Sequence, residues 1–134
     1  MGDEVHFYGN TMLQTGSSGR IRIGAGTHVQ PGCTFSAHVG EIVVGARCEI
    51  ASACSFYSYN HGIAAGREIM EQPLVSHGGI RIGDSVWLGH GVSVLDNVEI
   101  GNGAVIGAGS VVVKSIPENA IAAGVPARVI RMRS

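Results

Sequence analysis

The feature that most constrains this chain is an aliphatic residue at every sixth position over its C-terminal half. The set comprises Ile82, Leu88, Val94, Ile100, Ile106 and Val112. A helix turns by about 100° per residue, so this spacing would spread the side chains around all sides of a helix. In a strand, an even spacing keeps every member on one face. The pattern therefore predicts short strands, each followed by a bend.

A second set of small or aliphatic residues lies two positions ahead of the first. It comprises Ile80, Val86, Val92, Val98, Ala104 and Ser110. The N-terminal half keeps the same spacing in two blocks with a three-residue slip between them: Ile23, Val29 and Phe35, then Val44, Ile50 and Phe56. Bends this frequent do not suit a hairpin sandwich. They favour a solenoid in which each coil stacks on the one before.

The composition is that of one globular domain without a surface for polyanions. The chain has 134 residues, of which 45% are hydrophobic and 14% charged, and its net charge is -1. That charge gives no electrostatic basis for binding nucleic acid. No apolar run approaches the ~18 residues of a membrane helix, and no signal peptide opens the chain. We therefore expect a cytoplasmic protein with neither membrane insertion nor a nucleic-acid partner.

The three cysteines, Cys33, Cys48 and Cys54, fall in the small set of the repeat. Because that set faces inward, the register predicts buried structural thiols rather than reactive ones. The sequence contains no CxxC spacing, which would indicate zinc binding or redox chemistry.

With these repeats, the chain resembles the hexapeptide-repeat acyltransferases, and among them the sugar and polysaccharide O-acetyltransferases. The resemblance rests on residues 82–130, which begin IGDSVWLGHGVSVL and end AAGVPARVI, and on IGAGTHVQPG at residues 23–32. It implies an all-β fold, a left-handed parallel β-helix of triangular section with three hexapeptides in each coil. The left-handed sense comes from the resemblance alone, since crossovers between parallel strands are normally right-handed.

The resemblance also divides the chain. Coils are expected at residues 23–43, 44–61, 82–99 and 100–117. Residues 62–79 would then be a loop expelled from the second coil. The whole chain forms one domain, which starts with a loosely matching segment at residues 1–20 and ends in a cap at residues 118–134. Family members are homotrimers in which this loop reaches a neighbouring subunit and the active sites lie between subunits. Four coils bury little surface, so assembly is also physically reasonable.

His61 is the residue to which the resemblance assigns catalysis. It lies in YNHGI, residues 59–63, where the six-residue rhythm breaks off. In the sugar O-acetyltransferases of this family, the histidine of the matching NH segment is the general base that takes a proton from an acceptor hydroxyl. Imidazole suits that role because its ordinary pKa near 6.5 leaves it mostly neutral at pH 7. An exposed loop histidine without a catalytic role is the competing interpretation.

The resemblance implies acetyl-CoA as acyl donor and no metal. His90 and Ala108 are 18 residues apart, so they should stack at one corner, along a groove that suits a pantetheine arm. Both positions match coenzyme A contacts in the galactoside acetyltransferases, and a backbone amide around Gly91 is a candidate to stabilise the thioester oxyanion. Late cations match the binding site of the nucleotide phosphates: Lys114, Arg128 and Arg131. Ordinary exposed residues are the alternative interpretation of these positions.

Two residues are candidates for the acceptor side of the site. Trp87, the single tryptophan, resembles an outward indole that lines the acyl or acceptor site of the sialic-acid and capsule O-acetyltransferases. Packing beneath the 62–79 loop is its alternative role. Gln30 aligns with an acceptor-binding asparagine of the galactoside enzymes, with an offset of one residue.

Glu99 is a candidate to tune the base. Stacking of residues 56–61 beneath residues 94–99 would place Glu99 one rung from His61, at a spacing of about 4.8 Å. A carboxylate there would raise the imidazole pKa and fix its tautomer. A solvated surface glutamate is the alternative interpretation.

The expected function is acetyl-CoA-dependent O-acetylation of a sugar or polysaccharide precursor. N-acetylation of an amino sugar or an antibiotic is the alternative within acyl transfer. A γ-type carbonic anhydrase uses the same solenoid, but its zinc ligands include two histidines five residues apart. None of the six histidines here has such a partner, and Gly66 stands five residues beyond His61. The lyase is therefore disfavoured.

Overall fold

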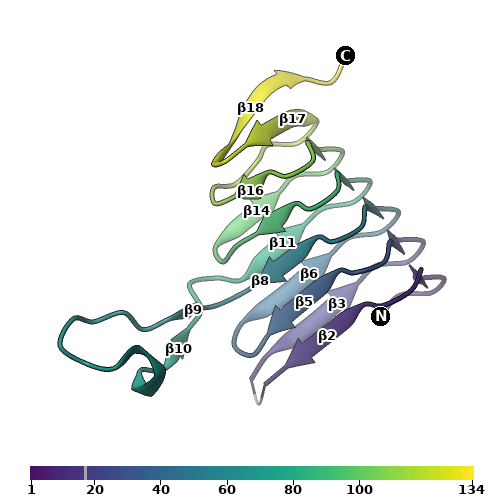
Figure 1. Cartoon of the computed structure of the whole chain (residues 1–134). Coiled ribbons are helices and arrows are strands. Elements are labelled where there is room, and N and C mark those ends of the chain that lie inside the picture. The colour runs from purple at the N-terminus through teal and green to yellow at the C-terminus, as the bar shows by residue number, and fades with distance from the viewer. Residues whose placement is uncertain (17) are drawn as a thin grey trace.

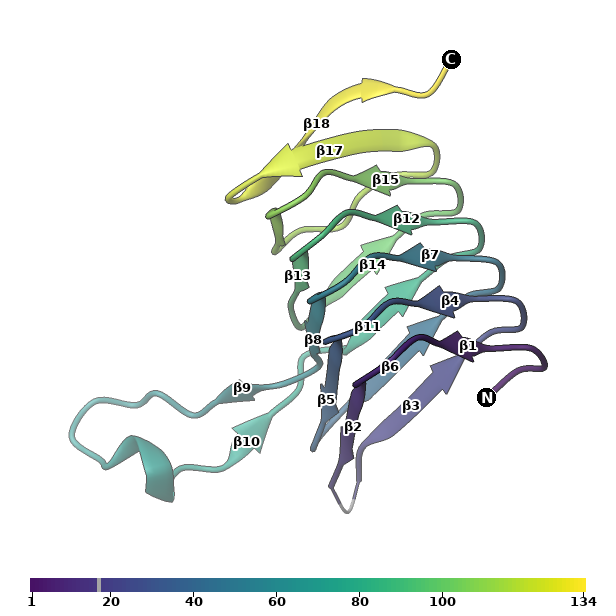
Figure 2. The ribbon, with the colours of Figure 1, turned by 45° about the vertical axis from the view of Figure 1, so that its right-hand side comes forward.

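The chain winds as a left-handed parallel β-helix of triangular section (Figure 1). The computed structural model describes residues 1–16 and 18–134. Short strands alternate with bends, and successive strands lie on different sides of a prism, as Figure 2 shows from a second direction. Each side of the prism is one sheet, whose strands come from successive coils.

Three sheets, named A, B and C, form the sides of the prism. Sheet A contains β1 (His6–Phe7), β4 (His28–Val29), β7 (Glu49–Ile50), β12 (Trp87–Leu88), β15 (Val105–Ile106), β17 (Ala120–Gly124) and β18 (Ala127–Met132). Sheet B contains β2 (Met12–Thr15), β5 (Thr34–Ala37), β8 (Ser55–Tyr57), β13 (Ser93–Val94) and β16 (Val111–Val112). Sheet C contains β3 (Arg20–Ile23), β6 (Glu41–Val44), β11 (Ile80–Ile82) and β14 (Val98–Ile100). Neighbouring strands run parallel, whereas β17 and β18 run antiparallel.

The chain passes from sheet A to sheet B to sheet C and back, so the prism has three corners, named AB, BC and CA. Corner residues often take the left-handed backbone conformation, as do Gly91 (φ 69°) and Gly109 (φ 73°) at corner AB and Asn97 (φ 64°) at corner BC. Glycine and asparagine adopt this conformation at low cost, which explains why they recur in the bends.

The six-residue set faces inward, as the spacing predicts. Leu88, Val94 and Ile106 are at most 1% exposed, and parallel pairing keeps them in register with neighbouring coils. The rings of Phe35 and Phe56 stack with 4.3 Å between their centroids and 6° between their planes. These columns fill a narrow interior, so each coil is stabilised mainly by burial against the next.

Residues 60–79 leave the prism at corner BC as a projecting arm (Figures 1 and 2). β9 (Asn60–His61) and β10 (Leu74–Val75) form an antiparallel ribbon, and the 3₁₀ helix η1 (Ile69–Glu71) lies beyond it. The loop predicted at residues 62–79 is therefore confirmed, and the ribbon moves its start to residue 60. The arm does not interrupt sheet C, because β6, which precedes the arm, pairs directly with β11, which follows it.

One glutamine holds the arm in shape. Gln72 is buried, although most of the arm is exposed. Its Oε1 accepts a hydrogen bond from the amide of Ala64 (2.8 Å), and its Nε2 donates to the carbonyls of Ala64 (2.9 Å) and Arg67 (3.3 Å). The distal bend is thus tied from within by one side chain.

Both ends of the chain extend the solenoid. β1 pairs with β4 and β2 pairs with β5, so the first residues form two sides of a partial coil. At the other end β17 continues sheet A, and β18 folds back along it after the cis peptide bond between Val125 and Pro126. The resulting hairpin covers the last coil. Within the described residues, no helix is long and apolar enough to cross a membrane.

Removing one stacked ring should destabilise the fold far more than removing its exposed neighbour. Phe56 is fully buried, so Phe56→Ala should lower the free energy of unfolding by about 3–5 kcal/mol. Tyr57 is 38% exposed, so Tyr57→Ala should cost about 1 kcal/mol or less. Urea denaturation followed by circular dichroism measures both losses. Equal losses would contradict the inward register of Phe56.

Candidate functional site

His61 lies at the root of the arm, on the leg that leaves corner BC. It is exposed, and in β9 it pairs with Leu74 of the returning leg. The amide of the next residue, Gly62, donates to the carbonyl of Pro73 (2.9 Å) and holds the two legs together beyond the histidine. An exposed imidazole on a braced ribbon is accessible to a substrate and is restrained in position, as a proton acceptor requires.

The predicted stacking of Glu99 on the rung next to His61 is wrong. Glu99 lies on β14 in sheet C, and the residue beside it on the coil below is Arg81. The prediction assumed that the chain stays on the prism as far as residue 61. The chain instead departs at residue 60, where β9 begins to pair with β10. Glu99 is an exposed glutamate of sheet C that lines a small pocket with Arg81 and with Gly78 and Gly79 at the end of the arm.

The carboxylate that reaches the root of the arm is that of Asp96, which follows β13 at corner BC. Its Oδ2 accepts hydrogen bonds from Asn60 Nδ2 (3.1 Å) and from the amide of His77 (2.7 Å). Its Oδ1 accepts one from the amide of Gly79 (2.8 Å). Sequence analysis missed Asp96, because an aspartate in a bend is ordinary. The sequence did contain one indication of its role, since Asp96 lies in the coil that follows the break in the repeat.

Aromatic side chains also gather beside the root. The hydroxyl of Tyr59 shares a hydrogen bond with Ser36 Oγ (2.9 Å). The Tyr59 ring meets the rings of His38 (5.5 Å between centroids) and Tyr57 (6.1 Å) edge-on. The repeat pattern did not reveal this cluster, because Tyr59 lies in the segment where the pattern breaks off. The surface from which His61 departs is therefore partly aromatic.

His90 and Ala108 stack at corner AB, as their spacing predicts. The amide of Gly109 donates to the carbonyl of His90 (2.8 Å), and His90 Nδ1 lies 2.8 Å from Ser52 Oγ on the coil below. Among the described residues, the amide N–H groups of His90 and Ala108 have no hydrogen-bond acceptor. Both residues are exposed, so the corner presents a row of unused backbone donors to an incoming polar group.

The amide of Gly91 is not available to an oxyanion, because it donates to the carbonyl of Ser52 (2.9 Å). The donor expected around this glycine must therefore be a neighbouring amide, and that of His90 is the candidate. Gly91 supplies the left-handed turn instead. A Cβ at this position would meet no atom within 4 Å, so lack of space is not the reason for glycine. The reason is the left-handed backbone conformation (φ 69°), which glycine adopts at low cost.

Trp87 points outward from sheet A and is 55% exposed, so no loop within residues 1–16 and 18–134 covers it. It pairs with Glu49 on the coil below and with Val105 on the coil above. It borders an open groove of about 420 Å³, whose other lining residues include Arg47, Ser85, Val86, Ile121 and Arg133. Gln30 follows β4 at corner AB, where its backbone amide donates to the carbonyl of Ile50 (2.9 Å).

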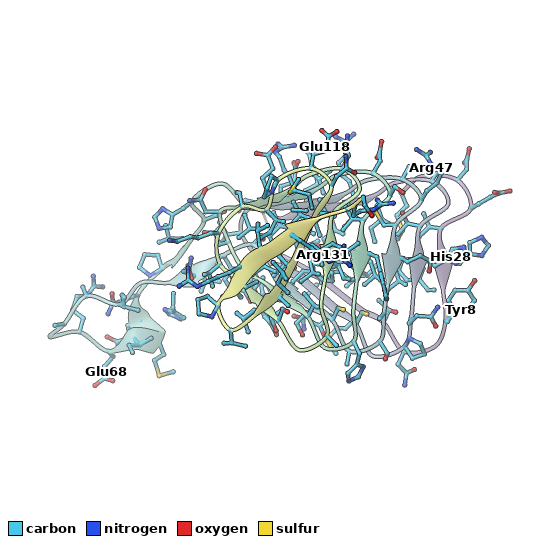
Figure 3. The ribbon with its side chains drawn as sticks, turned by 90° about the horizontal axis from the view of Figure 1, so that it is seen from above. Tyr8, His28, Arg47, Glu68, Glu118 and Arg131 are labelled. Carbon is cyan, nitrogen blue, oxygen red and sulfur yellow. The ribbon has the colours of Figure 1, made fainter. Side chains whose placement is uncertain are left out.

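The three candidate cations come from two places. Lys114 follows β16 at corner BC and is exposed. Arg128 and Arg131 lie on β18, opposite Ala123 and Ile121. Arg131 shares an outward column of sheet A with Trp87, through Val105 and Ile121. Figure 3 views the molecule from the end that β18 covers and labels Arg131 there.

The candidate residues occupy two different corners. His61 leaves from corner BC, whereas His90 and Ala108 lie at corner AB, on the other side of sheet B. Figure 3 shows the arm, with Glu68 in its distal part, projecting away from the prism. A single chain therefore does not bring the imidazole and the row of amide donors together.

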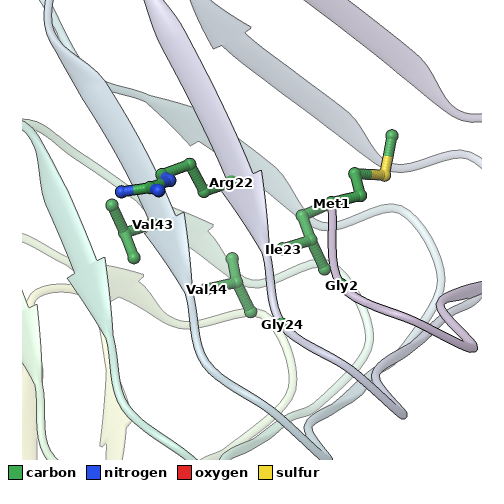
Figure 4. Close-up of a pocket in the computed structure, with 7 residues that line it drawn as sticks. All are labelled: Met1, Gly2, Arg22, Ile23, Gly24, Val43 and Val44. Atoms are coloured by element: carbon green, nitrogen blue, oxygen red, sulfur yellow. The ribbon is translucent and has the colours of Figure 1, made fainter.

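A cavity of about 320 Å³ lies at the edge of sheet C, where the first residues meet β3 and β6 (Figure 4). Its lining includes none of the candidate residues: Met1, Gly2, Arg22, Ile23, Gly24, Val43 and Val44. Within residues 1–16 and 18–134, no group of three or more His, Cys, Asp or Glu side chains is arranged to hold a metal ion.

Comparison with known proteins agrees with the repeat. Residues 79–114 match the family model of the bacterial transferase hexapeptide (six repeats). The chain belongs to the hexapeptide-repeat transferases. The galactoside O-acetyltransferase of Escherichia coli is 58% identical over 52 residues, which cover 39% of this chain and 26% of that enzyme. Among solved structures, the hexapeptide-repeat acetyltransferase VCA0836 of Vibrio cholerae, solved with acetyl coenzyme A, superposes with a TM-score of 0.84 at 26% sequence identity. The superposition covers 100% of this chain and 70% of that chain.

This hexapeptide-repeat chain spans about half the length of the curated relatives that it matches. The Saccharomyces cerevisiae protein YJL218W is 44% identical over 91 residues, which cover 68% of this chain but 45% of that protein. The alignment therefore relates the solenoid described here to one part of each relative.

The thiols of this chain should be unreactive while it is folded. Cys33, Cys48 and Cys54 are at most 1% exposed, which confirms their inward register. Burial raises the pKa of the Cys48 thiol. The Cys33 thiol together with burial raises the pKa of Cys54, while the hydrogen bond with Cys54 lowers the pKa of Cys33 to about 7. Because burial keeps a reagent away from all three sulfur atoms, including that of Cys33, a disulfide reagent at neutral pH should label the native protein slowly. The same reagent should label all three thiols in guanidinium. Rapid labelling of the native protein would contradict this.

Proposed function

We propose that the chain is the catalytic solenoid of an acetyl-CoA-dependent O-acetyltransferase whose acceptor is a hydroxyl of a sugar or a polysaccharide precursor. The observation that carries the proposal is the exposed position of His61 at the root of a braced arm. The similarity to the galactoside O-acetyltransferase and to an acetyltransferase solved with acetyl coenzyme A supports the donor and the acceptor class.

His61 acts as a general base in this proposal. Its neutral imidazole accepts the proton of the acceptor hydroxyl while the oxygen attacks the thioester carbonyl of the donor. The amides of His90 and Ala108 are the donors available to the pantetheine arm or to the developing oxyanion. Collapse of the tetrahedral adduct forms the acetyl ester and breaks the carbon–sulfur bond. The imidazolium then returns its proton to the departing thiolate.

The active site would form between two copies of the chain. Since His61 and the amide row lie at different corners, corner AB of one copy must face the arm of another. The arm has the surface for such a contact: Ile63, Ile69 and Met70 are 80%, 57% and 86% exposed. Exposed apolar groups of this size typically mark an interaction site. A closed ring of three copies would contain three equivalent sites.

Replacing the base should abolish most turnover without disturbing the fold. Because His61 is exposed, His61→Ala should lower acetyl transfer by about 10²–10⁴-fold while leaving coenzyme A binding and thermal stability near those of the wild type. His77→Ala is the matched control, since His77 is an exposed histidine on the other leg of the same arm. Steady-state kinetics of both variants tests the assignment. Near-normal turnover of His61→Ala would place the chemistry elsewhere.

The assembly is tested by light scattering coupled to size-exclusion chromatography. The expected mass is that of three copies of the 13.8 kDa chain. Replacement of both Ile69 and Met70 by Asp should dissociate the trimer and abolish activity together, because a charge is costly to bury in an apolar contact. A fully active monomer would refute the inter-subunit site.

The acceptor is tested by release of free thiol from acetyl-CoA across a panel of sugars, amino sugars and antibiotics. O-acetylation predicts turnover with neutral sugars and a product whose acetyl group is lost in mild alkali. N-acetylation, the alternative, predicts turnover that requires a free amine and a product that resists the same treatment. Turnover limited to the amines would replace the proposed acceptor class.

A further inference from the structure

We propose that Asp96 is a positioning residue for His61: its carboxylate fastens both legs of the arm to the coil above and thereby fixes where the histidine projects. This inference rests on the proposed role of His61 as the base. The hydrogen-bond partners of Asp96 among the described residues do not include His61, and Asp96 takes no part in the proton transfer.

The outgoing leg is fastened through the residue next to His61. Asn60 Nδ2 donates to Asp96 Oδ2 at 3.1 Å, and Asn60 lies opposite Val75 in the ribbon. A side chain one peptide unit from the base is therefore bonded to the prism. Without that bond, the position of His61 relative to the prism would depend mainly on the ribbon's own pairing.

The returning leg is fastened at three points within four residues. The amide of His77 donates to Oδ2 (2.7 Å), the amide of Gly79 to Oδ1 (2.8 Å), and Ser76 Oγ to Oδ1 (3.3 Å). At Gly79, an added Cβ would clash with the backbone carbonyl of Glu41 on β6. The leg thus re-enters the solenoid through a gap that fits only glycine, and the amide of that glycine is one of the donors to the carboxylate.

The carboxylate of Asp96 is fully used by these bonds. Each of its oxygens accepts two, which matches the roughly four lone-pair sites of a carboxylate. Asp96 is 9% exposed and is the one Asp, Glu, Lys or Arg classed as buried within residues 1–16 and 18–134. A buried charge is tolerated where it is satisfied in this way, so the arrangement strongly specifies one geometry for the root.

Asp96 and Gln72 have separable effects on the arm. Gln72 bonds within the arm, to Ala64 and Arg67, so it sets the shape of the distal bend. Asp96 bonds between the arm and the prism, so it sets the direction in which the ribbon leaves. That direction controls the distance between His61 and an acceptor held elsewhere, and misplacement by about 1 Å can cost about 10²-fold in rate.

The test is Asp96→Asn, alone and combined with His61→Ala. Asparagine keeps one acceptor oxygen but turns an NH₂ group toward two of the donors, so the fastening is halved while the shape of the side chain is kept. In the wild-type background, kcat should fall by about 10- to 100-fold with little change in the KM for acetyl-CoA. In the His61→Ala background, the same change should have almost no further effect, because the base that it positions is gone.

Asp84→Asn is the matched control. Asp84 also bridges two coils, since its Oδ1 accepts a hydrogen bond from the amide of Ala46 (2.8 Å), but it lies at corner CA. Its replacement should change kcat little, and equally in both backgrounds. If Asp96→Asn fails to fold, Asn60→Ala is the substitute, since it removes only the outgoing bond. Asn60→Ala should lower kcat by a smaller factor than Asp96→Asn in the wild-type background. It should leave kcat almost unchanged in the His61→Ala background.

Hydrogen exchange separates this inference from the proposed function. Asp96→Asn should speed exchange at the amides of His77 and Gly79, which donate to the carboxylate, whatever residue performs catalysis. Unchanged exchange, or an equal loss of kcat in both backgrounds, would overturn the positioning role. A fully active His61→Ala with faster exchange would refute the base and leave Asp96 as an anchor of the arm alone.

Discussion

The backbone hydrogen bonds between successive coils decide where every candidate residue lies. At corner AB, for example, the amide of Gly91 binds the carbonyl of Ser52 and the amide of Gly109 binds that of His90, so each bend is copied onto the next. Only alternate amides are used in this copying. At corner AB, the unused amides of the exposed residues His90 and Ala108 form a row along the outer edge of the prism. The same pairing that holds the fold together therefore also produces its donors.

Much of the fold could be predicted from the sequence, because an even hydrophobic spacing has few physical solutions. Inward residues such as Leu88 and Cys54 follow from periodicity alone. The handedness did not follow from spacing and needed the resemblance. Glu99 was misplaced because counting by coils fails where the chain leaves the prism, and Arg81 occupies the expected place of His61. The use of the Gly91 amide depends on a positive φ, which no spacing reveals.

The arm is ordered by polar contacts and not by a core of its own. None of its residues belongs to the buried hydrophobic cluster, and its two buried residues are Gln72 and the glycine at its exit, Gly79. Hydrogen bonds are directional, so a few of them can fix an orientation without burying apolar surface. This suits an element whose apolar tip, with Ile63 and Met70, is exposed in the single chain. The core of the prism stabilises the fold, whereas the hydrogen bonds of the arm fix its orientation relative to the prism.

The pairing of β6 with β11 has a consequence for how such a chain can change over time. Ile42 lies opposite Ile80 and Phe56 lies opposite Val94, so the coils on both sides of the arm keep their register as though the inserted residues were absent. The entropic cost of closing a longer loop grows only slowly with its length. Insertions, deletions and substitutions in the distal arm can therefore accumulate without a stability penalty in the solenoid. The arm and the solenoid can therefore vary separately, although they are joined at one corner.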